Sequence, residues 1–264
     1  MATSRANDER NPEPNERRLL DLGDQQLAAA QWGQGDIGIV MLHDGLGSIS
    51  QWRSVPHQVA ARTGTAVLAY ERAGHGTSKP VPQGPWPADW LHREAAVLQR
   101  VLDHVGCARP FIVGHSDGGS TALLHAVDAG DTISGVLAIA AHTWVEDICR
   151  TSIVDMRSQT ERFVAGLSKH HDAPAAVFEA WSGVWVSDEF SRWDIRPMLG
   201  AIEVPAVIAQ GTEDAYASDD QVHLTVEAIG ANARAEFLPG LGHIAHHDDA
   251  NAVVDLIVAA YSAC

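Results

Sequence analysis

Residues 110–119 read Pro-Phe-Ile-Val-Gly-His-Ser-Asp-Gly-Gly, and residues 120–125 continue as Ser-Thr-Ala-Leu-Leu-His. An apolar run that ends in Gly-x-Ser-x-Gly before a helix-like segment predicts a sharp strand-to-helix turn with a serine at its tip. Gly114 and Gly118 have no Cβ, so strand and helix can approach each other closely. The free N–H groups of the helix start would lie beside the serine oxygen. Ser116 is therefore the candidate nucleophile, and the alternative is a glycine-rich turn with an ordinary serine.

The composition predicts one α/β domain that binds a small molecule. The chain has 264 residues, of which 45% are hydrophobic and 20% charged, enough for a full core and an insertion. No segment is long and apolar enough to span a bilayer, so no membrane association is expected. The formal charge of −16 argues against a nucleic-acid partner, because phosphate contacts need clustered lysine and arginine. An acidic surface favours neutral or cationic ligands.

The cysteines and histidines give no sign of a metal or redox site. Cys107, Cys149 and Cys264 show neither metal-binding nor redox spacing, which favours a reducing cytoplasm. The run His-His-Asp-Asp at 246–249 is interpreted as a solvated helix start, and neither a metal nor an organic cofactor is expected. Residues 1–17 are polar and lack the apolar core of a secretory signal, so they are predicted to form a mobile tail. The oligomeric state stays open, with a homodimer among the options.

Short apolar runs alternate with helix-like segments along the chain. The expected strands are residues 37–42, 65–70, 111–114, 135–140, 204–210 and 234–238, with an antiparallel pair within 18–32. Most of these runs are continuously apolar, as in parallel strands buried on both faces. Leu91, Ala95, Leu98 and Leu102 mark the apolar face of one intervening helix. The alternation predicts a doubly wound, mostly parallel α/β sheet, which binds ligands at the carboxyl ends of its strands, where Ser116 lies.

The alternation breaks between residues 143 and 201. This segment has helical pieces without a convincing core strand, and it holds half of the eight tryptophans. We predict a helical cap over the site at 143–201, inserted between the core segments 18–142 and 202–264. The cap residues expected to line the pocket are Trp144, Trp181 and Trp185. The alternative is that these aromatic side chains only fix the cap to the body.

A serine nucleophile needs a base, and the base needs a carboxylate that orients it. The strand after the cap runs into Gly-Thr-Glu-Asp, so Asp214 lies in a loop at a carboxyl strand end. The following strand runs into Pro-Gly-Leu-Gly-His, which places His243 in the next such loop. Together with Ser116, these residues form the expected catalytic triad.

Neighbouring residues compete for both partner positions. Glu213 could replace Asp214, but it is expected to face solvent. His246 and His247 could replace the base, but both lie beyond the glycine-rich loop and are expected to begin the last helix.

An acyl-transfer site also needs N–H donors for the charge that develops on the reacting oxygen. The backbone N–H of Asp117 directly follows the nucleophile. The second donor should come from the loop after strand 37–42, which reads His-Asp-Gly-Leu-Gly-Ser at 43–48. Gly45 is the expected donor, and Leu46 is the alternative as well as an expected lining residue of the pocket. The competing interpretation of this loop is a plain glycine-rich turn.

These motifs resemble the α/β-hydrolase superfamily from about residue 18 onward. Four stretches match in order: His-Asp-Gly-Leu-Gly-Ser at 43–48, Glu-Arg-Ala-Gly-His-Gly-Thr-Ser at 71–78, Gly-His-Ser-Asp-Gly-Gly at 114–119, and Gly-Thr-Glu-Asp with Gly-Leu-Gly-His at 211–214 and 240–243. Glu71 stands where the family usually has aspartate, and His-Asp-Gly departs from the commoner His-Gly-x. The resemblance implies an α/β-hydrolase fold with a Ser-Asp-His triad.

Single residues narrow the reaction within the superfamily. Its dehalogenases and epoxide hydrolases use an aspartate where this chain has Ser116, and its carbon–carbon hydrolases carry tryptophan where this chain has Ile244. Its hydroxynitrile lyases use a cap lysine, whereas Lys169, within the polar run 168–171, is interpreted as part of a solvated turn. Hydrolysis of an ester, thioester or lactone through an acyl-enzyme is the expected reaction. The alternatives are a cofactor-free haloperoxidase or perhydrolase, and a ligand-binding protein with little turnover.

The residue after the nucleophile could select the substrate. Ser-Asp-Gly-Gly resembles the elbow of valacyclovir hydrolase, in which this aspartate is associated with the ammonium group of the substrate. The resemblance implies that Asp117 could bind α-amino-acid esters. The alternative is that Asp117 is simply a carboxylate favoured at a helix N-terminus.

Overall fold

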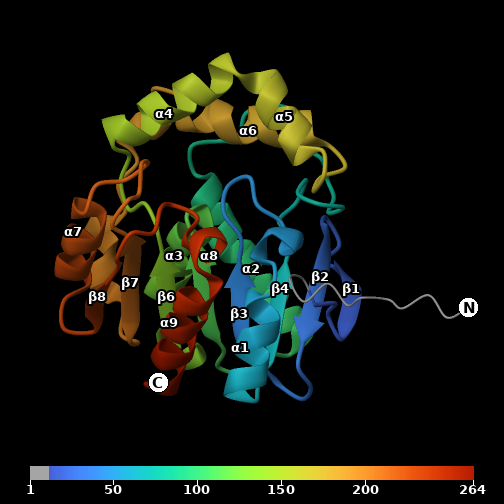
Figure 1. Cartoon of the computed structure of the whole chain (residues 1–264), viewed down its shortest axis with the longest axis vertical. Helices are drawn as coiled ribbons and strands as arrows, with labels where there is room; N and C mark the ends of the chain where they lie inside the picture. The colour runs from blue at the N-terminus through green and yellow to red at the C-terminus, as the bar shows by residue number, and fades with distance from the viewer. Residues whose placement is uncertain (1–11) are drawn as a thin grey trace, which may run out of the picture.

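Eight strands form one sheet across residues 12–264, the part of the chain that the computed structural model describes (Figure 1). The strands are β1 (Glu16–Asp21), β2 (Gln26–Trp32), β3 (Ile37–Leu42), β4 (Ala66–Tyr70), β5 (Phe111–His115), β6 (Gly135–Ile139), β7 (Ala206–Gly211) and β8 (Ala233–Leu238). Their order is β1-β2-β4-β3-β5-β6-β7-β8. The pairs β1–β2 and β2–β4 are antiparallel, and all later pairs are parallel. The prediction of a mostly parallel α/β sheet is confirmed.

The central strands carry no hydrophobic alternation because both of their faces are covered. Every residue of β4, β5, β6 and β7 is buried. Within β3, Val40 belongs to the apolar core on one face of the sheet, and Ile39 belongs to the core on the other. Burial of each such side chain stabilises the fold by about 1.5–3 kcal/mol. The expected strands are present, with ends displaced by at most two residues.

Helices cover the two faces of this sheet. On one face pack α1 (Val55–Thr63) and α9 (Ala250–Ser262), and on the other pack α2 (Trp90–Val105), α3 (Asp117–Ala129) and α7 (Asp220–Ile229). The predicted apolar face of α2 is buried, Leu91 and Leu98 completely. Short 3-10 turns lie at Ile49–Trp52, Gly130–Thr132, Phe190–Arg192 and Arg196–Ala201, and a one-turn helix α8 at Ala245–Asp248.

Three helices between β6 and β7 lie across the carboxyl ends of the strands. They are α4 (Asp147–Ser158), α5 (Thr160–Leu167) and α6 (Pro174–Trp185), which pack on one another at the top of Figure 1. The backbone N–H of Trp86 donates to the carbonyl of Ala180 at 3.1 Å, which ties α6 to the loop before α2. The three helices therefore form a layer above the edge of the sheet that carries Ser116.

The first strand corrects the predicted start of the core. Glu16 and Arg17 pair with Gln31 and Ala30 in β1, so the predicted tail is too long by at least these two residues. Most side chains of β1 are exposed because β1 is the edge strand of the sheet. Its sequence is therefore largely polar and lacks the continuous apolar run that predicts the central strands. The rest of the tail prediction falls largely on residues 1–11, which lie outside the described part of the chain.

Within residues 12–264, no helix combines the length and apolar character needed to cross a membrane.

Candidate active site

Ser116 lies at the sharp turn between β5 and α3. Its φ of 52° is in the left-handed region, a strained conformation for a residue with a side chain. A Cβ on Gly118 would lie 2.3 Å from the carbonyl oxygen of Leu42, and one on Gly114 would lie 2.1 Å from the carbonyl oxygen of Gly118. Since a real Cβ cannot approach backbone atoms that closely, both positions require glycine. The turn predicted from Gly-x-Ser-x-Gly is present for this steric reason.

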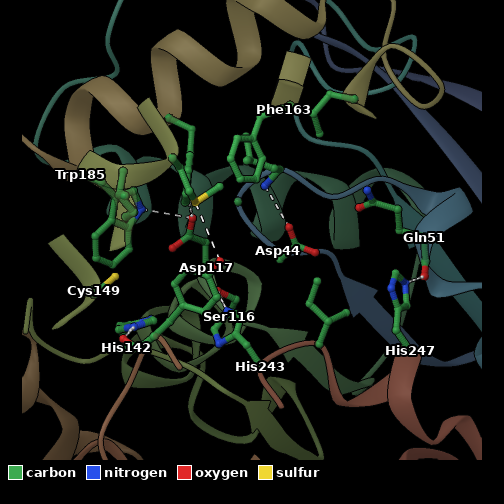
Figure 2. Close-up of a pocket in the computed structure, with 18 residues that line it drawn as sticks. Asp44, Gln51, Ser116, Asp117, His142, Cys149, Phe163, Trp185, His243 and His247 are labelled. Atoms are coloured by element: carbon green, nitrogen blue, oxygen red, sulfur yellow. Dashed lines mark hydrogen bonds between the residues drawn. The ribbon is translucent and has the colours of Figure 1, made fainter. Parts of the chain in front are cut away.

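Two successive hydrogen bonds link Ser116 to His243 and His243 to Asp214. His243 Nε2 lies 3.0 Å from Ser116 Oγ (Figure 2). His243 Nδ1 lies 2.8 Å from Asp214 Oδ2. Because a carboxylate can only accept, Nδ1 carries the proton and Nε2 is free to accept from the serine hydroxyl. The loops after β7 and β8 supply Asp214 and His243, so the parallel sheet brings to Ser116 two residues that lie 98 and 127 positions further along the sequence.

The environment of Asp214 keeps it ionised. Burial alone would raise the pKa of its carboxyl group, but the hydrogen bond from His243, and the positive charge that this imidazole carries when protonated, lower the pKa below the ordinary value. The backbone N–H of Tyr216 donates to the second carboxylate oxygen at 2.8 Å. Each oxygen thus has a donor, and the carboxylate is held facing the imidazole.

The competing residues lie elsewhere. Glu213 is exposed, as expected. His247 Nε2 lies 2.9 Å from the carbonyl oxygen of Gln51, and His246 packs against Trp52 with ring centroids 4.8 Å apart. The interpretation of 246–249 as a solvated helix start is wrong for His246, which is 3% exposed. These histidines belong to α8, and α9 begins only after Asp249, which caps it.

The two backbone N–H groups predicted to bind an oxyanion make no hydrogen bond within the described residues. Among residues 12–264, neither Gly45 N–H nor Asp117 N–H finds an acceptor. Leu46 N–H, the alternative donor, instead donates to Asp44 Oδ1 at 2.9 Å. The geometry therefore favours Gly45 over Leu46 as the partner of Asp117.

A cavity of about 230 Å³ lies between Ser116 and helices α4–α6 (Figure 2). Its apolar wall comes mainly from these helices: Ile153, Met156, Phe163, Leu167, Trp181 and Trp185. Its charged and titratable lining residues include Asp44, Asp117, His142 and His243, and its lining within residues 12–264 contains no lysine or arginine. The cavity therefore suits an apolar group without negative charge.

Asp117 joins the turn at Ser116 to helix α6. Its Oδ2 accepts hydrogen bonds from Trp181 Nε1 at 2.8 Å and Trp185 Nε1 at 3.4 Å, whereas Oδ1 has no partner among residues 12–264. The side chain is 1% exposed, and this burial raises the pKa of the Asp117 carboxyl to about 6, although nearby Arg72 and the two indoles favour the ionised form. A solvated helix-start carboxylate would have none of these contacts.

The predicted pocket residues divide into two groups. Leu46, Asp117, Trp181 and Trp185 line the cavity, and Trp144 does not. The prediction for Trp144 is wrong, because its ring packs against the Arg196 guanidinium at 4.2 Å. The segment before α4 turns this side chain towards the turn that contains Arg196.

Sequence reasoning missed several lining residues. His142, Cys149 and Tyr216 all face the cavity. Their position directly after β6, at the start of α4 and after Asp214 was the available signal, since loops at carboxyl strand ends form such sites. His142 Nε2 lies 3.4 Å from the carbonyl oxygen of Tyr216, and burial lowers the pKa of His142 to about 4, so this imidazole is neutral.

No group of three or more histidine, cysteine, aspartate or glutamate side chains within the described residues is arranged to hold a metal ion.

Known proteins share both the sequence pattern and the fold. A sequence profile of the alpha/beta hydrolase family matches residues 39–256. The human serine hydrolase BPHL is 27% identical over 196 residues, covering 72% of this chain and 67% of that protein. A non-heme haloperoxidase of Rhodococcus erythropolis is 29% identical over 245 residues, covering 80% of this chain and 87% of that protein. The crystal structure of an enol-lactonase from Burkholderia xenovorans LB400 has the same fold, with a TM-score of 0.71, 24% identity and coverage of 93% and 100%.

Proposed function

This chain belongs to the alpha/beta hydrolase family, and we propose that it is a serine hydrolase of carboxylic esters, thioesters or lactones. The observation that carries the proposal is the continuous chain of hydrogen bonds from Ser116 through His243 to Asp214, beside an apolar cavity. In this arrangement the base lies within hydrogen-bond distance of both the serine hydroxyl and the orienting carboxylate, as nucleophilic acyl transfer requires.

The reaction begins with proton transfer to His243. Its Nε2 takes the Ser116 proton as Oγ attacks the acyl carbon, and Asp214 stabilises the imidazolium that forms. The imidazolium then gives its proton to the leaving oxygen or sulfur, and an acyl-enzyme remains on Ser116. Water, activated by the same nitrogen, attacks the acyl carbon and releases the acid.

The negative charge of each tetrahedral intermediate needs preorganised donors. Gly45 N–H and Asp117 N–H are the free backbone donors next to Ser116. Removal of one such donor in other acyl-transfer enzymes costs about 3–4 kcal/mol of transition-state stabilisation. The pair is therefore proposed as the oxyanion hole.

The cavity favours a neutral or cationic substrate with an apolar part. We assign residues 143–201 as a cap over the core segments 18–142 and 202–264, with Trp181, Trp185 and Leu46 in contact with the substrate. The unpaired oxygen of Asp117 is the group that would accept from an ammonium ion, which supports α-amino-acid esters as test substrates.

Perhydrolysis is a second candidate, because the relative from Rhodococcus erythropolis is named a non-heme haloperoxidase. The same acyl-enzyme would then react with hydrogen peroxide in place of water. The two reactions share the first half and differ only in the second nucleophile, so activity with and without peroxide separates them.

The proposal predicts covalent labelling at one serine. A fluorophosphonate should add a single phosphonyl group, found at Ser116 by peptide mapping, because this hydroxyl has a base at 3.0 Å that is itself oriented by a carboxylate. Ser120 serves as an internal control, since it is buried in α3, the helix that follows Ser116, and should stay unmodified.

The native protein should hydrolyse p-nitrophenyl esters with apolar or aminoacyl groups and discriminate against acyl groups with a carboxylate.

Other results would change the assignment. Absence of both labelling and ester turnover would contradict a serine hydrolase and favour the ligand-binding alternative. Turnover that depends on added peroxide would favour the perhydrolase. Equal rates for anionic and cationic acyl groups would contradict the assigned role of the acidic cavity.

A further inference from the structure

Three successive carbonyl groups of the loop after β3 accept hydrogen bonds from three different imidazoles. The contacts are His43 Nδ1 to Asp44 O at 2.7 Å, His75 Nε2 to Gly45 O at 2.9 Å, and His171 Nε2 to Leu46 O at 3.0 Å. Since a carbonyl oxygen only accepts, each of these nitrogens must carry a proton. All three side chains are buried. Hydrogen bonds from three histidines to its carbonyl groups therefore fix the loop that carries Gly45 N–H.

This arrangement determines where the N–H groups of the loop point. In a trans peptide the C=O and N–H bonds point in opposite directions. His43 Nδ1 and the Arg72 guanidinium both donate to Asp44 O, and by fixing this carbonyl they also fix the direction of Gly45 N–H, which belongs to the same peptide. In the same way, the next two peptides direct Leu46 N–H to Asp44 Oδ1 at 2.9 Å and Gly47 N–H to Asp44 O at 3.1 Å.

His171 differs from the other two histidines because it comes from the connection between α5 and α6. Its Nδ1 accepts from the backbone N–H of Gly76 at 2.8 Å, and its Nε2 donates to the carbonyl of Leu46. An N–H group can only donate, so both contacts require the neutral tautomer with the proton on Nε2. The ring is 6% exposed, and burial lowers its pKa, which keeps it neutral. The interpretation of residues 168–171 as a solvated turn is wrong for this residue.

Two neighbouring hydrogen bonds also attach the α5–α6 connection to the core. His170 Nδ1 lies 2.8 Å from Ser50 Oγ, and the backbone N–H of Asp172 donates to the carbonyl of Gly76 at 2.8 Å. Of these three residues of the connection, His170, His171 and Asp172, only His171 bonds a carbonyl within the loop 44–46 that carries the proposed oxyanion donor. The imidazole of His171 therefore couples the position of the α5–α6 connection to the conformation of the loop 44–46.

We propose that His171 is a positioning residue that completes the oxyanion hole from the cap. The inference rests on the proposed function, because it assumes that Gly45 N–H stabilises an oxyanion. The helices over the cavity then do more than enclose the substrate: withdrawal of the α5–α6 connection would release Leu46 O and loosen the loop that holds the donor.

Two substitutions separate the two hydrogen bonds of the ring. In His171→Asn the side-chain oxygen can replace Nδ1 as acceptor from Gly76, but nothing replaces the Nε2 donor. In His171→Gln the longer amide can place an N–H near Nε2 and keep the bond to Leu46. His170→Asn is the matched control, because it makes the same substitution in the same connection, at a ring that contacts Ser50 and not the loop 44–46.

The test combines kinetics with hydrogen exchange of the native full-length chain. His171→Asn should lower kcat for a p-nitrophenyl ester about tenfold, less than the roughly 10²–10³-fold effect of losing a donor itself, with KM within about twofold. Peptides covering residues 43–48 should exchange faster in His171→Asn than in the native protein. His171→Gln should restore most of both properties, and His170→Asn should match the native protein.

The outcomes distinguish this inference from the proposed function. Native-like exchange at residues 43–48 in His171→Asn would overturn the positioning role even if the native protein hydrolyses esters. Equal losses of kcat in His171→Asn and His171→Gln, accompanied by a fall in Tm, would also overturn the positioning role. They would show that His171 only stabilises the fold. A third outcome is faster exchange in His171→Asn with a native protein that hydrolyses no ester. This would overturn the proposed function, and with it the role of His171 in catalysis.

Discussion

Ser116→Ala is expected to lower kcat for ester hydrolysis by about 10⁵–10⁶, as removal of the nucleophile does in other serine hydrolases. Without Oγ no acyl-enzyme can form, whereas the cavity and the N–H groups of Gly45 and Asp117 remain. A residual rate about 10³–10⁴ above that of uncatalysed hydrolysis should therefore persist. The measurement is steady-state turnover of a p-nitrophenyl ester at high protein concentration, with KM determined alongside.

Asp214→Asn provides the companion test of the triad. Its amide N–H can donate to His243 Nδ1, which would move the imidazole proton to Nε2 and leave no base facing Ser116. A loss of about 10⁴ in kcat is expected. Glu213→Gln is the matched control, because this exposed carboxylate is adjacent in sequence and should leave kcat within about twofold. Similar losses in both variants would show that the orienting carboxylate is misassigned.

Adding Asp214→Asn to Ser116→Ala should cost almost nothing further, because residues that act on one proton transfer lose their effects together. A further large loss in the double variant would mean that Asp214 stabilises the fold or binds substrate independently of His243.

The fold and the turn at Ser116 could be predicted because each depends on neighbouring residues. Continuous apolar runs identify strands buried on both faces, and the glycines at 114 and 118 are needed wherever β5 and α3 approach so closely. Asp214 and His243 could be found because parallel strands bring their carboxyl ends to one edge. In these cases the pattern is local, or the sheet topology supplies the long-range contact.

The errors concern side chains whose partners are distant in sequence. His171 and His246 were expected in solvent because the surrounding residues are polar, yet each is buried by contacts with residues more than 90 positions away. Trp144 was expected in the cavity, but Arg196 covers it. A buried imidazole is stable only when specific donors and acceptors meet it, and those partners become visible only in the folded chain.

The interpretation of Asp117 was incomplete for the same reason. Its position at the start of α3 suggested a favourable helix-start carboxylate, but α6 covers it and leaves one oxygen without a partner among residues 12–264. Burial of such a charge costs free energy unless it is fully hydrogen-bonded. The sequence could not reveal this cost, because the covering indoles of Trp181 and Trp185 lie more than 60 residues away.

Asp117→Asn is accordingly expected to raise the free energy of unfolding by about 3 kcal/mol at pH 8. Burial raises the pKa of Asp117 from 3.8 to about 6, and a difference of about two units between folded and unfolded chains corresponds to about 3 kcal/mol. The asparagine oxygen can still accept from Trp181 and Trp185, and its amide group replaces the unpaired oxygen. The variant therefore keeps the contacts and loses the buried charge.

The pH dependence has a definite sign. Between pH 3.8 and about 6 the folded protein holds a proton on Asp117 that the unfolded chain has lost, so its stability falls as the pH rises through this window. Asparagine does not titrate, and its advantage should shrink to about half at pH 5 and to under about 1 kcal/mol at pH 4. Urea denaturation of both proteins at pH 4, 5 and 8 measures this directly.

Asp131→Asn is the matched control for this series, because it removes an exposed carboxylate and should change stability by less than about 0.5 kcal/mol at each pH. A gain in Asp117→Asn that is equally large at pH 4 and pH 8 would contradict the titration argument, and so would no gain at pH 8.

A carboxylate that destabilises the fold this much, beside the nucleophile, is expected to contribute to function. The same variant should therefore lose preference for aminoacyl over neutral esters while gaining stability, so that one substitution measures both the cost of the charge and its use.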